Sequence, residues 1–480
     1  MFDIVAGDSM APSRVDVAVI GAGPGGYAAA FQAADLGLRT ALIDEDPQLG
    51  GTCLLRGCIP SKALLHAARL LTDAEEAAAW GIHYDKPRVD LEAFRNRVQA
   101  IIGKLTKGVR TLAGSRKVEV IHARAMFKDA TTLQLSGTAG SHELSFGHAI
   151  LASGSKPVIS AALRLDDPRV MDSTSALQLP DVPRRLLVVG GGYIGLELGT
   201  VYQALGSEVT VVVALPRLLN AVDADLVRPL HQRMHRRFKA IKLNTTVKTL
   251  DAVTEGLAAT FVDSEGTSTE MFDRVLVALG RRPNSDQLGL EHTKVAIAPN
   301  GFVQVDRQMR TTEPTIYAIG DVVGEPMLAH KATHEGLVAA RVIAGRPAAF
   351  DATAIPAVIF TDPEIAWCGL TEEAANGSGQ AVKVARFPWA ASGRATTLGR
   401  NEGLTKLVLD AESGRVLGMG ICGVGAGELI AEGVLAVEMG AVAEDVASSI
   451  HPHPTLSETI MEAAASFDGS PTHLFMPNRS

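Results

Sequence analysis

The first strong pattern in the chain is a short apolar run that ends in a cluster of glycines. Residues 15–20 (VDVAVI) are mostly apolar, residues 21–26 read GAGPGG, and an alanine-rich segment follows. This order predicts a buried strand, a tight turn and a helix. A second apolar run, residues 40–43, ends at Asp44. The start of the chain therefore reads as alternating strands and helices around a parallel sheet.

The glycines have the spacing of a dinucleotide-binding turn. In G-x-G-x-x-G, Gly21 makes the turn, Gly23 lets a pyrophosphate approach the backbone, and Gly26 lets the helix pack on the strand. Asp44 follows the second strand, where a carboxylate accepts hydrogen bonds from ribose hydroxyls. With strand, helix and acid all in place, we expect a dinucleotide at this turn.

The same unit occurs again later in the chain. Residues 185–189 form an apolar run, and glycines follow at Gly190, Gly192 and Gly195 before a helical segment and a strand at 208–213. Two such folds indicate either two dinucleotides or a duplicated fold with one empty site.

The second unit lacks the expected acid. Val213 stands at the end of its second strand, and no arginine replaces it there to bind a 2′-phosphate. Arg217 lies four residues later and is a candidate to reach that position. The preference between NAD and NADP is therefore the least determined part of the prediction.

The remaining patterns predict further domains. Another strand ends at Gly280, and a strand at 315–320 ends at Asp321, the edge of a sheet where ligands bind. From residue 353 the pattern changes to strands and apolar helices suited to oligomerisation. The expected fold class is α/β, with two Rossmann-like dinucleotide-binding domains and a C-terminal α+β dimerisation domain. The expected boundaries are 1–156, 157–282, 283–352 and 353–480.

Composition excludes several classes of protein. The chain has 480 residues, of which 46% are hydrophobic and 20% charged, and its formal charge is −8. An acidic chain does not favour nucleic acid as a partner, and the basic run 231–242 is typical of a solvated helix face. The first fourteen residues lack the pattern of a signal peptide, and no run of 18 apolar residues occurs. We expect a cytoplasmic protein without a membrane partner.

Two of the four cysteines lie in the glycine-flanked segment 50–62 (GGTCLLRGCIPSK). Four residues separate Cys53 from Cys58, so the sulfurs lie one helical turn apart or across a tight loop. Pro60 suits the first turn of a helix, where Cys58 would be stabilised as a thiolate, and Lys62 adds positive charge. From the spacing alone, a purely structural role, as a disulfide or as two buried thiols, is as compatible with the sequence as a redox-active pair.

A second candidate site lies near the C-terminus, in the segment 451–458 (HPHPTLSE). Glu458 can complete a helix capping box with Thr455. It can also orient the imidazole of His453 and raise its basicity. The sequence does not decide between these two uses.

Taken together, these motifs resemble the pyridine nucleotide–disulfide oxidoreductases over nearly the whole chain. The resemblance implies a flavin domain split in sequence by an inserted NAD domain, followed by a dimerisation domain. It also implies bound FAD and NAD. The residues that match the family's FAD contacts are Gly21, Gly23, Gly26, Asp44, Gly51, Thr52, Lys62 and Asp321, and those that match its NAD contacts are Gly190, Gly192, Gly195, Glu197 and Gly280.

The resemblance further implies a reaction. Cys53 and Cys58 would form the redox-active disulfide, with His453 as the base and Glu458 orienting it. The substrate implied is dihydrolipoamide on the lipoyl-carrier protein of a 2-oxoacid dehydrogenase or glycine cleavage complex, and the assembly implied is a homodimer. The alternative is an NADPH-dependent disulfide reductase of the glutathione-reductase type, which would need arginines after the second strand of the second nucleotide fold.

Overall fold

The computed structural model describes residues 13–137 and 140–475. The chain divides into two compact units. The expectation that no signal peptide precedes the fold concerns residues that lie almost entirely outside the described part. The four-part domain division stays a prediction. The first unit comprises Met1–Pro60, Glu92–Pro157 and Arg281–Asp351, and the second comprises Ser61–Leu91, Val158–Gly280 and Ala352–Ser480.

The first unit is built on a mixed sheet with helices against it. Its elements are β1 (Arg14–Ile20), α1 (Pro24–Asp35), β2 (Thr40–Asp44), α2 (Gly51–Arg56), the start of α3 (Cys58–Glu76), α4 (Leu91–Ser115), β3 (Glu119–His122), β4 (Arg124–Asp129), β5 (Thr132–Gly137), β6 (Gly140–Leu151), β7 (Ser155–Pro157), β16 (Arg281–Pro283), η3 (Leu290–His292), β17 (Ile316–Ala318), η4 (Gly320–Val322) and α8 (Ala329–Ile343).

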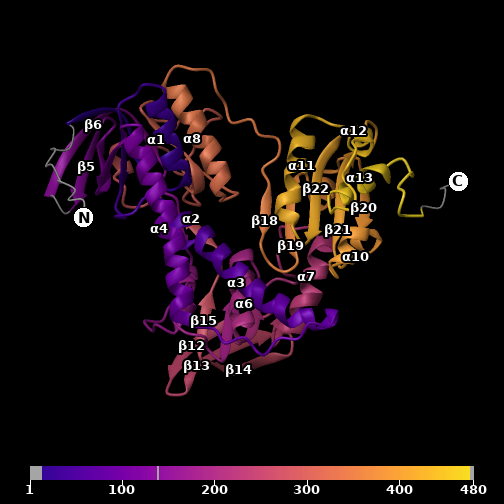
Figure 1. The fold of residues 1–480 in the computed structure, drawn as a ribbon. Helices are drawn as coiled ribbons and strands as arrows, with labels where there is room; N and C mark the ends of the chain where they lie inside the picture. The colour runs from indigo at the N-terminus through magenta and orange to yellow at the C-terminus, as the bar shows by residue number, and fades with distance from the viewer. Residues whose placement is uncertain (1–12, 138–139, 476–480) are drawn as a thin grey trace, which may run out of the picture. The chain divides into compact units, whose positions relative to one another are not determined.

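The strands of the first unit explain why residues far apart in sequence meet. The sheet order is β3-β2-β1-β6-β5-β4, with β17 paired to β6. Strands β2, β1, β6 and β17 run parallel, so their carboxyl ends share one edge, where Asp44 and Asp321 lie. Figure 1 shows α1 and α8 side by side. A Cβ at Gly336 would lie 2.6 Å from the carbonyl oxygen of Gly25, so the two helices need glycine to pack this closely.

A short ladder marks where the chain leaves this unit and returns to it. Strands β7 and β16 pair antiparallel, with Lys156 opposite Arg282. The residues between them, 158–280, belong to the second unit. The pairing gives the physical basis for an insertion into a split domain, because the two ends of the inserted segment lie together.

The second unit contains two larger sheets and a three-stranded meander. Its elements are the rest of α3, η1 (Ala77–Trp80), η2 (Ala161–Leu163), β8 (Val170–Met171), α5 (Ser173–Leu177), β9 (Arg185–Val189), α6 (Tyr193–Leu205), β10 (Glu208–Val212), α7 (Ala224–Arg237), β11 (Ala240–Lys242), β12 (Thr246–Val253), β13 (Gly256–Asp263), β14 (Gly266–Phe272), β15 (Arg274–Val277), β18 (Ala357–Ile359), β19 (Glu364–Gly369), α9 (Glu372–Ser378), β20 (Val382–Pro388), η5 (Trp389–Ala391), α10 (Gly393–Thr397), β21 (Leu404–Asp410), β22 (Val416–Gly423), α11 (Ala426–Glu438), α12 (Ala443–Ser448) and α13 (Glu458–Ala465).

The sheets of the second unit confirm the predicted architecture. The order β11-β10-β9-β15-β8 is fully parallel and repeats the nucleotide fold, and β18-β19-β22-β21-β20 is antiparallel. The meander β12-β13-β14 was not predicted from the sequence. Figure 1 shows α11 in front of the antiparallel sheet, where the chain is coloured from orange to yellow.

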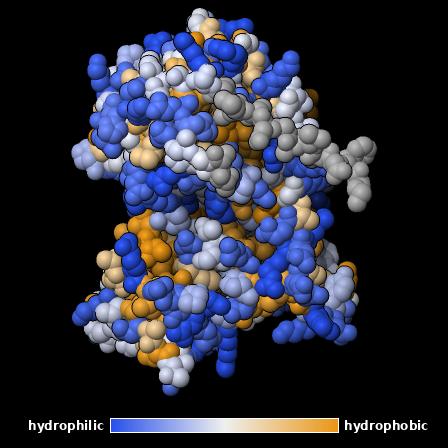
Figure 2. All heavy atoms as spheres, turned by 90° about the vertical axis from the view of Figure 1, so that its left-hand side faces the viewer, coloured by the Kyte–Doolittle hydropathy of each residue, from blue (hydrophilic) through white to orange (hydrophobic). Residues whose placement is uncertain are grey.

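The face in Figure 2 is largely hydrophilic, and its hydrophobic residues lie in patches interrupted by hydrophilic ones. Among the helices of the described residues, none is both long enough and apolar enough to cross a membrane.

The basic run 231–242 is not simply a solvated helix face, because Arg233 is mostly buried and ion-paired to Glu76 and Asp362 at 2.5 Å each.

Candidate active site

The glycine turn of the first unit leaves one position open. Gly21 has φ +103°, and a Cβ there would lie 2.3 Å from the carbonyl oxygen of Ala152. A Cβ at Gly26 would lie 1.8 Å from the carbonyl oxygen of Gly21, so both glycines are required by close backbone contacts. At Gly23 the nearest atom would be 4.0 Å away, at Gly51. The backbone at Gly23 is therefore the part of the turn that a ligand can approach closely.

Acidic groups flank this turn at the carboxyl edge of the sheet. The carboxylate of Asp44 accepts the backbone N–H of Ala22 at 2.5 Å and that of Asp46 at 2.8 Å. Burial raises the pKa of Asp44 although these bonds oppose the shift. Asp321 accepts a hydrogen bond from the hydroxyl of Ser155 at 2.5 Å. Both carboxylates are thus held in fixed positions by the fold.

The cysteine segment begins against the glycine turn. A Cβ at Gly51 would lie 2.5 Å from Cα of Gly23, and Gly51 and Thr52 are the first two residues of α2. Cys53 lies in α2, and Cys58 is the first residue of α3. The two cysteines therefore lie on consecutive helices rather than one turn apart on a single helix. Cys58 occupies a helix N-terminus, as the sequence predicted.

Tyr27 is a neighbour of this segment that the sequence did not single out. It lies in the first turn of α1 and is half-buried. Burial raises the pKa of Tyr27, and the negative charge of a Cys53 thiolate raises it further. The only sequence signal for Tyr27 was its place directly after the third glycine.

The other two cysteines have different surroundings. Cys368 and Cys422 are buried in the core of the antiparallel sheet. Burial raises the pKa of the Cys368 thiol to about 12 and that of Cys422 still higher. Thiols that stay protonated are poor nucleophiles, so these two residues act in packing.

Further along α3, Lys62 forms an ion pair within the second unit. Its ammonium lies 2.9 Å from one carboxylate oxygen of Glu197 and 3.2 Å from the other. Glu197, in α6, is buried and also accepts the backbone N–H of Phe360 at 2.9 Å. The Lys62 ammonium lies 4.5 Å from the centroid of the Phe360 ring. The sequence identified the lysine and the glutamate but not Phe360, which holds both.

The glycine turn of the second unit repeats the geometry of the first. Gly190 has φ +119°, and a Cβ there would lie 2.3 Å from the carbonyl oxygen of Ala278. A Cβ at Gly195 would lie 2.8 Å from the carbonyl oxygen of Gly190, whereas at Gly192 no atom lies within 4 Å. Gly280, with φ +116°, follows the neighbouring strand β15. This turn therefore also leaves its middle glycine open to a ligand.

A histidine and a glutamate meet in the C-terminal segment. Nδ1 of His453 lies 2.8 Å from Oε1 of Glu458. The other oxygen, Oε2, accepts the backbone N–H of Thr455 at 2.8 Å. Burial works against ionisation of Glu458, yet the bonds from Thr455 and His453 keep the pKa of Glu458 below its ordinary value. The bond to the Thr455 backbone and the bond to His453 exist together, one on each oxygen. The predicted capping box is not the start of the helix, because α13 begins at Glu458 and its N-cap is Ser457.

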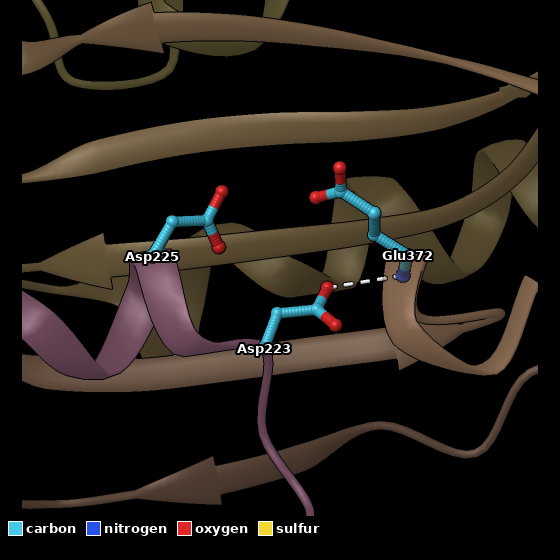
Figure 3. A group of neighbouring side chains, drawn as sticks. All are labelled: Asp223, Asp225 and Glu372. Atoms are coloured by element: carbon cyan, nitrogen blue, oxygen red, sulfur yellow. Dashed lines mark hydrogen bonds between the residues drawn. The ribbon is translucent and has the colours of Figure 1, made fainter. Parts of the chain in front are cut away.

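Three acids elsewhere in the second unit surround a lysine. Figure 3 shows Asp223 and Asp225 at the start of α7 and Glu372 at the start of α9. The buried ammonium of Lys406 lies 2.8 Å from each of the three carboxylates. The cluster is therefore neutralised by a protein cation, and we assign no metal to it.

Comparisons with known proteins agree with this picture. A family model described as "Pyridine nucleotide-disulphide oxidoreductase" matches residues 15–336, and the dimerisation domain of the same family matches residues 355–464. A dihydrolipoyl dehydrogenase of Haemophilus influenzae is 46% identical over 96% of this chain and 96% of its own length.

Solved structures share the whole fold. LpdA from Mycobacterium tuberculosis superposes with a TM-score of 0.87 at 27% identity, covering 95% of this chain and 99% of that one. The HOCl-induced flavoprotein disulfide reductase RclA from Escherichia coli superposes with a TM-score of 0.82 at 26% identity, covering 93% and 98%. The two glycine-turn sheets and the C-terminal antiparallel sheet thus have the folds seen in these solved structures.

Proposed function

Because the chain belongs to the pyridine nucleotide–disulphide oxidoreductase family, we propose that it oxidises protein-bound dihydrolipoamide to lipoamide and reduces NAD+. The 46% identity to a dihydrolipoyl dehydrogenase supports the choice of substrate within the family. The observation that carries the chemistry is the 2.8 Å contact between His453 and Glu458, which provides an oriented base for thiol chemistry.

The two glycine turns support the cofactors FAD and NAD. Each turn has an outer pair of glycines locked by backbone contacts and a middle one, Gly23 or Gly192, whose backbone is open to a pyrophosphate. We propose that FAD is held by the first turn with Asp44, Gly51, Thr52, Lys62 and Asp321, and NAD by the second with Glu197 and Gly280. When bound, FAD supplies two-electron transfer between a dithiol and the nicotinamide.

The protein groups have distinct tasks in the proposed reaction. His453 accepts the proton of one substrate thiol, because only a thiolate attacks a disulfide. That thiolate attacks Sγ of Cys53, which breaks the Cys53–Cys58 bond and releases Cys58 as a thiolate. The second substrate thiol then attacks the mixed disulfide, breaks its bond to Cys53 and closes the lipoamide ring, and its proton passes to the Cys53 thiolate that leaves. The substrate loses two electrons and two protons, and the cysteine pair gains the two electrons.

The position of Cys58 suits its task. As the first residue of the 19-residue helix α3, it lies at the positive end of the helix dipole, which stabilises a thiolate. Lys62 follows one turn later, and its ammonium is paired with Glu197, so the helix dipole is the positive end that Cys58 meets. Cys53 lies on α2 and is the sulfur that we assign to exchange with the substrate.

The match to a dimerisation domain supports a homodimer. We propose that His453 of the partner subunit faces the cysteines of this subunit, so that the active site is complete only in the dimer. The lipoyl group would be presented by the carrier protein of a 2-oxoacid dehydrogenase or glycine cleavage complex. We also propose a cytoplasmic location, because disulfides in reducing compartments are usually transient and catalytic, as the proposed Cys53–Cys58 bond is.

An anaerobic titration of the flavin-loaded protein tests the proposal. Dihydrolipoamide should bleach the flavin absorbance in wild type and in Cys368→Ser, the matched control in the core. Neither Cys53→Ser nor Cys58→Ser should be bleached. Bleaching by glutathione but not by dihydrolipoamide would show that the substrate is wrong. Bleaching of the Cys53→Ser variant at the wild-type rate would show that the site is wrong.

A further inference from the structure

The end of β10 borders the second glycine turn without presenting an acid. Val213 is only 5% exposed, and a Cβ at Gly191 would lie 2.8 Å from its Cγ2 and 3.2 Å from Cδ2 of Leu218. The backbone N–H of Leu219 donates to the carbonyl oxygen of Gly191 at 3.0 Å. The segment 213–219 therefore wraps the turn, at the place where this fold receives the adenine ribose of a dinucleotide.

Arg217 lies on this segment, but a second residue holds its charge. Its two terminal nitrogens each lie 2.5 Å from a carboxylate oxygen of Glu373. Its Nε donates to the side-chain oxygen of Asn220 at 3.2 Å, and its Nη2 donates to the backbone carbonyl oxygen of Asn220 at 2.8 Å. The pair keeps the pKa of Arg217 above, and that of Glu373 below, the ordinary values. The guanidinium thus makes four hydrogen bonds within the protein, two of them to Glu373.

The position of Glu373 is itself fixed by the buried cluster in Figure 3. Asp223 accepts the backbone N–H of Glu372 at 3.1 Å, drawn as the dashed line, and that of Glu373 at 3.0 Å. Lys406 in turn holds Asp223 at 2.8 Å. The first turn of α9 is therefore anchored to the segment that precedes α7, and this anchoring presents Glu373 to Arg217.

We propose that Glu373 is a specificity-determining residue of the second nucleotide site. It occupies Arg217 and so denies a cation to the 2′-phosphate of NADP+. The site then prefers NAD+ although position 213 carries no carboxylate. NADP+ binds more weakly because its 2′-phosphate must first displace Glu373 from Arg217, and NAD+ has no such phosphate. This inference rests on the proposed use of a pyridine nucleotide and assigns the residue that selects it.

Calorimetry on the flavin-loaded protein tests the inference without turnover. The probes are 5′-AMP and 2′,5′-ADP, which differ only in the 2′-phosphate. Glu373→Gln should bind 2′,5′-ADP about tenfold more tightly than wild type does, the effect of one released charge-assisted contact, with 5′-AMP unchanged. The double variant Arg217→Gln/Glu373→Gln should lose this gain.

Two further variants serve as controls. Asp181→Asn breaks a similar ion pair, in which Arg274 donates to Asp181 at 2.6 and 2.8 Å. Arg274 is the first residue of β15, so this pair lies at the opposite end of that strand from the glycine turn. The variant should change the affinity for neither 5′-AMP nor 2′,5′-ADP. Arg217→Gln alone should leave 2′,5′-ADP binding unchanged, because Arg217 is already occupied. A loss of 2′,5′-ADP affinity in Arg217→Gln, or no gain in Glu373→Gln, would overturn the inference.

The outcome is separable from that of the proposed function. Turnover of dihydrolipoamide with NAD+ but no affinity change in Glu373→Gln refutes the inference alone. The expected affinity change without dihydrolipoamide turnover refutes the proposed substrate and supports the inference. Absence of binding of either probe to every variant overturns the inference, and turnover with NAD+ then decides the proposed function by itself.

Discussion

Glu458 holds His453 and the backbone beside it with the two oxygens of one carboxylate. Oε1 lies 2.8 Å from Nδ1 of His453, and Oε2 accepts the N–H of Thr455 at 2.8 Å. The backbone bond fixes the direction of the carboxylate, and the carboxylate fixes the plane and the tautomer of the imidazole. The other ring nitrogen is thereby set to accept a proton.

Replacing the base should affect thiol chemistry alone. We expect His453→Gln to lower kcat for dihydrolipoamide oxidation by about 10²–10⁴-fold, the usual contribution of a general base. Glu458→Gln keeps the shape but loses the charge, so its loss should be about tenfold to a hundredfold. Reduction of an artificial dye by NADH bypasses the cysteines and should stay near the wild-type rate. Full dihydrolipoamide activity in Glu458→Gln would contradict the orienting role.

A mixed dimer tests whether the base comes from the other subunit. His453→Gln and Cys53→Ser homodimers should both be inactive. A doubly tagged heterodimer of the two contains one site with both wild-type residues, so we expect about half of wild-type activity. An inactive heterodimer would show that base and cysteines act within one subunit.

The two open glycines allow the nucleotide sites to be separated. Gly23 and Gly192 have φ −70° and −80°, and an added Cβ would have no atom closer than 4.0 Å, so alanine at either position is compatible with the fold. Gly23→Ala should therefore purify folded but with little flavin. Gly192→Ala should keep its flavin and bind NAD+ at least about tenfold more weakly. Flavin absorbance and calorimetry measure the two effects, and the same loss in both variants would contradict the assignment of separate sites.

The buried carboxylate of Asp362 should make the free energy of unfolding depend on pH. Asp362 contacts Arg69 at 3.3 Å and Arg233 at 2.5 Å, and it also accepts a bond from Arg400. Burial opposes ionisation, yet the three arginines keep the pKa of Asp362 below its ordinary value. The folded state therefore gains stability from this group above the unfolded pKa of about 3.9, and loses it as the pH falls through the lower folded pKa.

Asp362→Asn measures that contribution. At pH 7 the variant should lose about 3 kcal/mol of unfolding free energy, because three arginines lose a buried charged partner and keep only their second carboxylates, Asp73, Glu76 and Glu402. Urea unfolding at several pH values should show the difference from wild type shrinking below about pH 4. A difference that is constant from pH 7 to pH 3 would mean that Asp362 contributes only by packing.

The parts of the fold that the sequence predicted are those with local signals. Glycine spacing at Gly21 and Gly190 and the apolar runs around them set the parallel strands, and Pro60 placed Cys58 at a helix start. The spacing of the cysteines left a single helix or a loop open, and the structure places them on two helices because α2 ends at Arg56 and α3 begins at Cys58.

Contacts between distant segments were beyond the reach of sequence patterns. Phe360 meets Lys62 and Glu197 across about 160 to 300 residues, and no periodicity records such a pairing. The same holds for Glu373, which engages Arg217 although 156 residues separate them. The sequence named Arg217 only as a candidate to reach the position of the 2′-phosphate, and the fold places the carboxylate of Glu373 against it.

The most direct test of the account is the anaerobic rate of dihydrolipoamide oxidation with NAD+ and with NADP+ as acceptors. We expect rapid reduction of NAD+ and little reduction of NADP+, because Val213 does not prevent NAD+ from binding. No turnover with either acceptor, despite bound flavin, would contradict the central claim that the cysteine pair takes electrons from dihydrolipoamide.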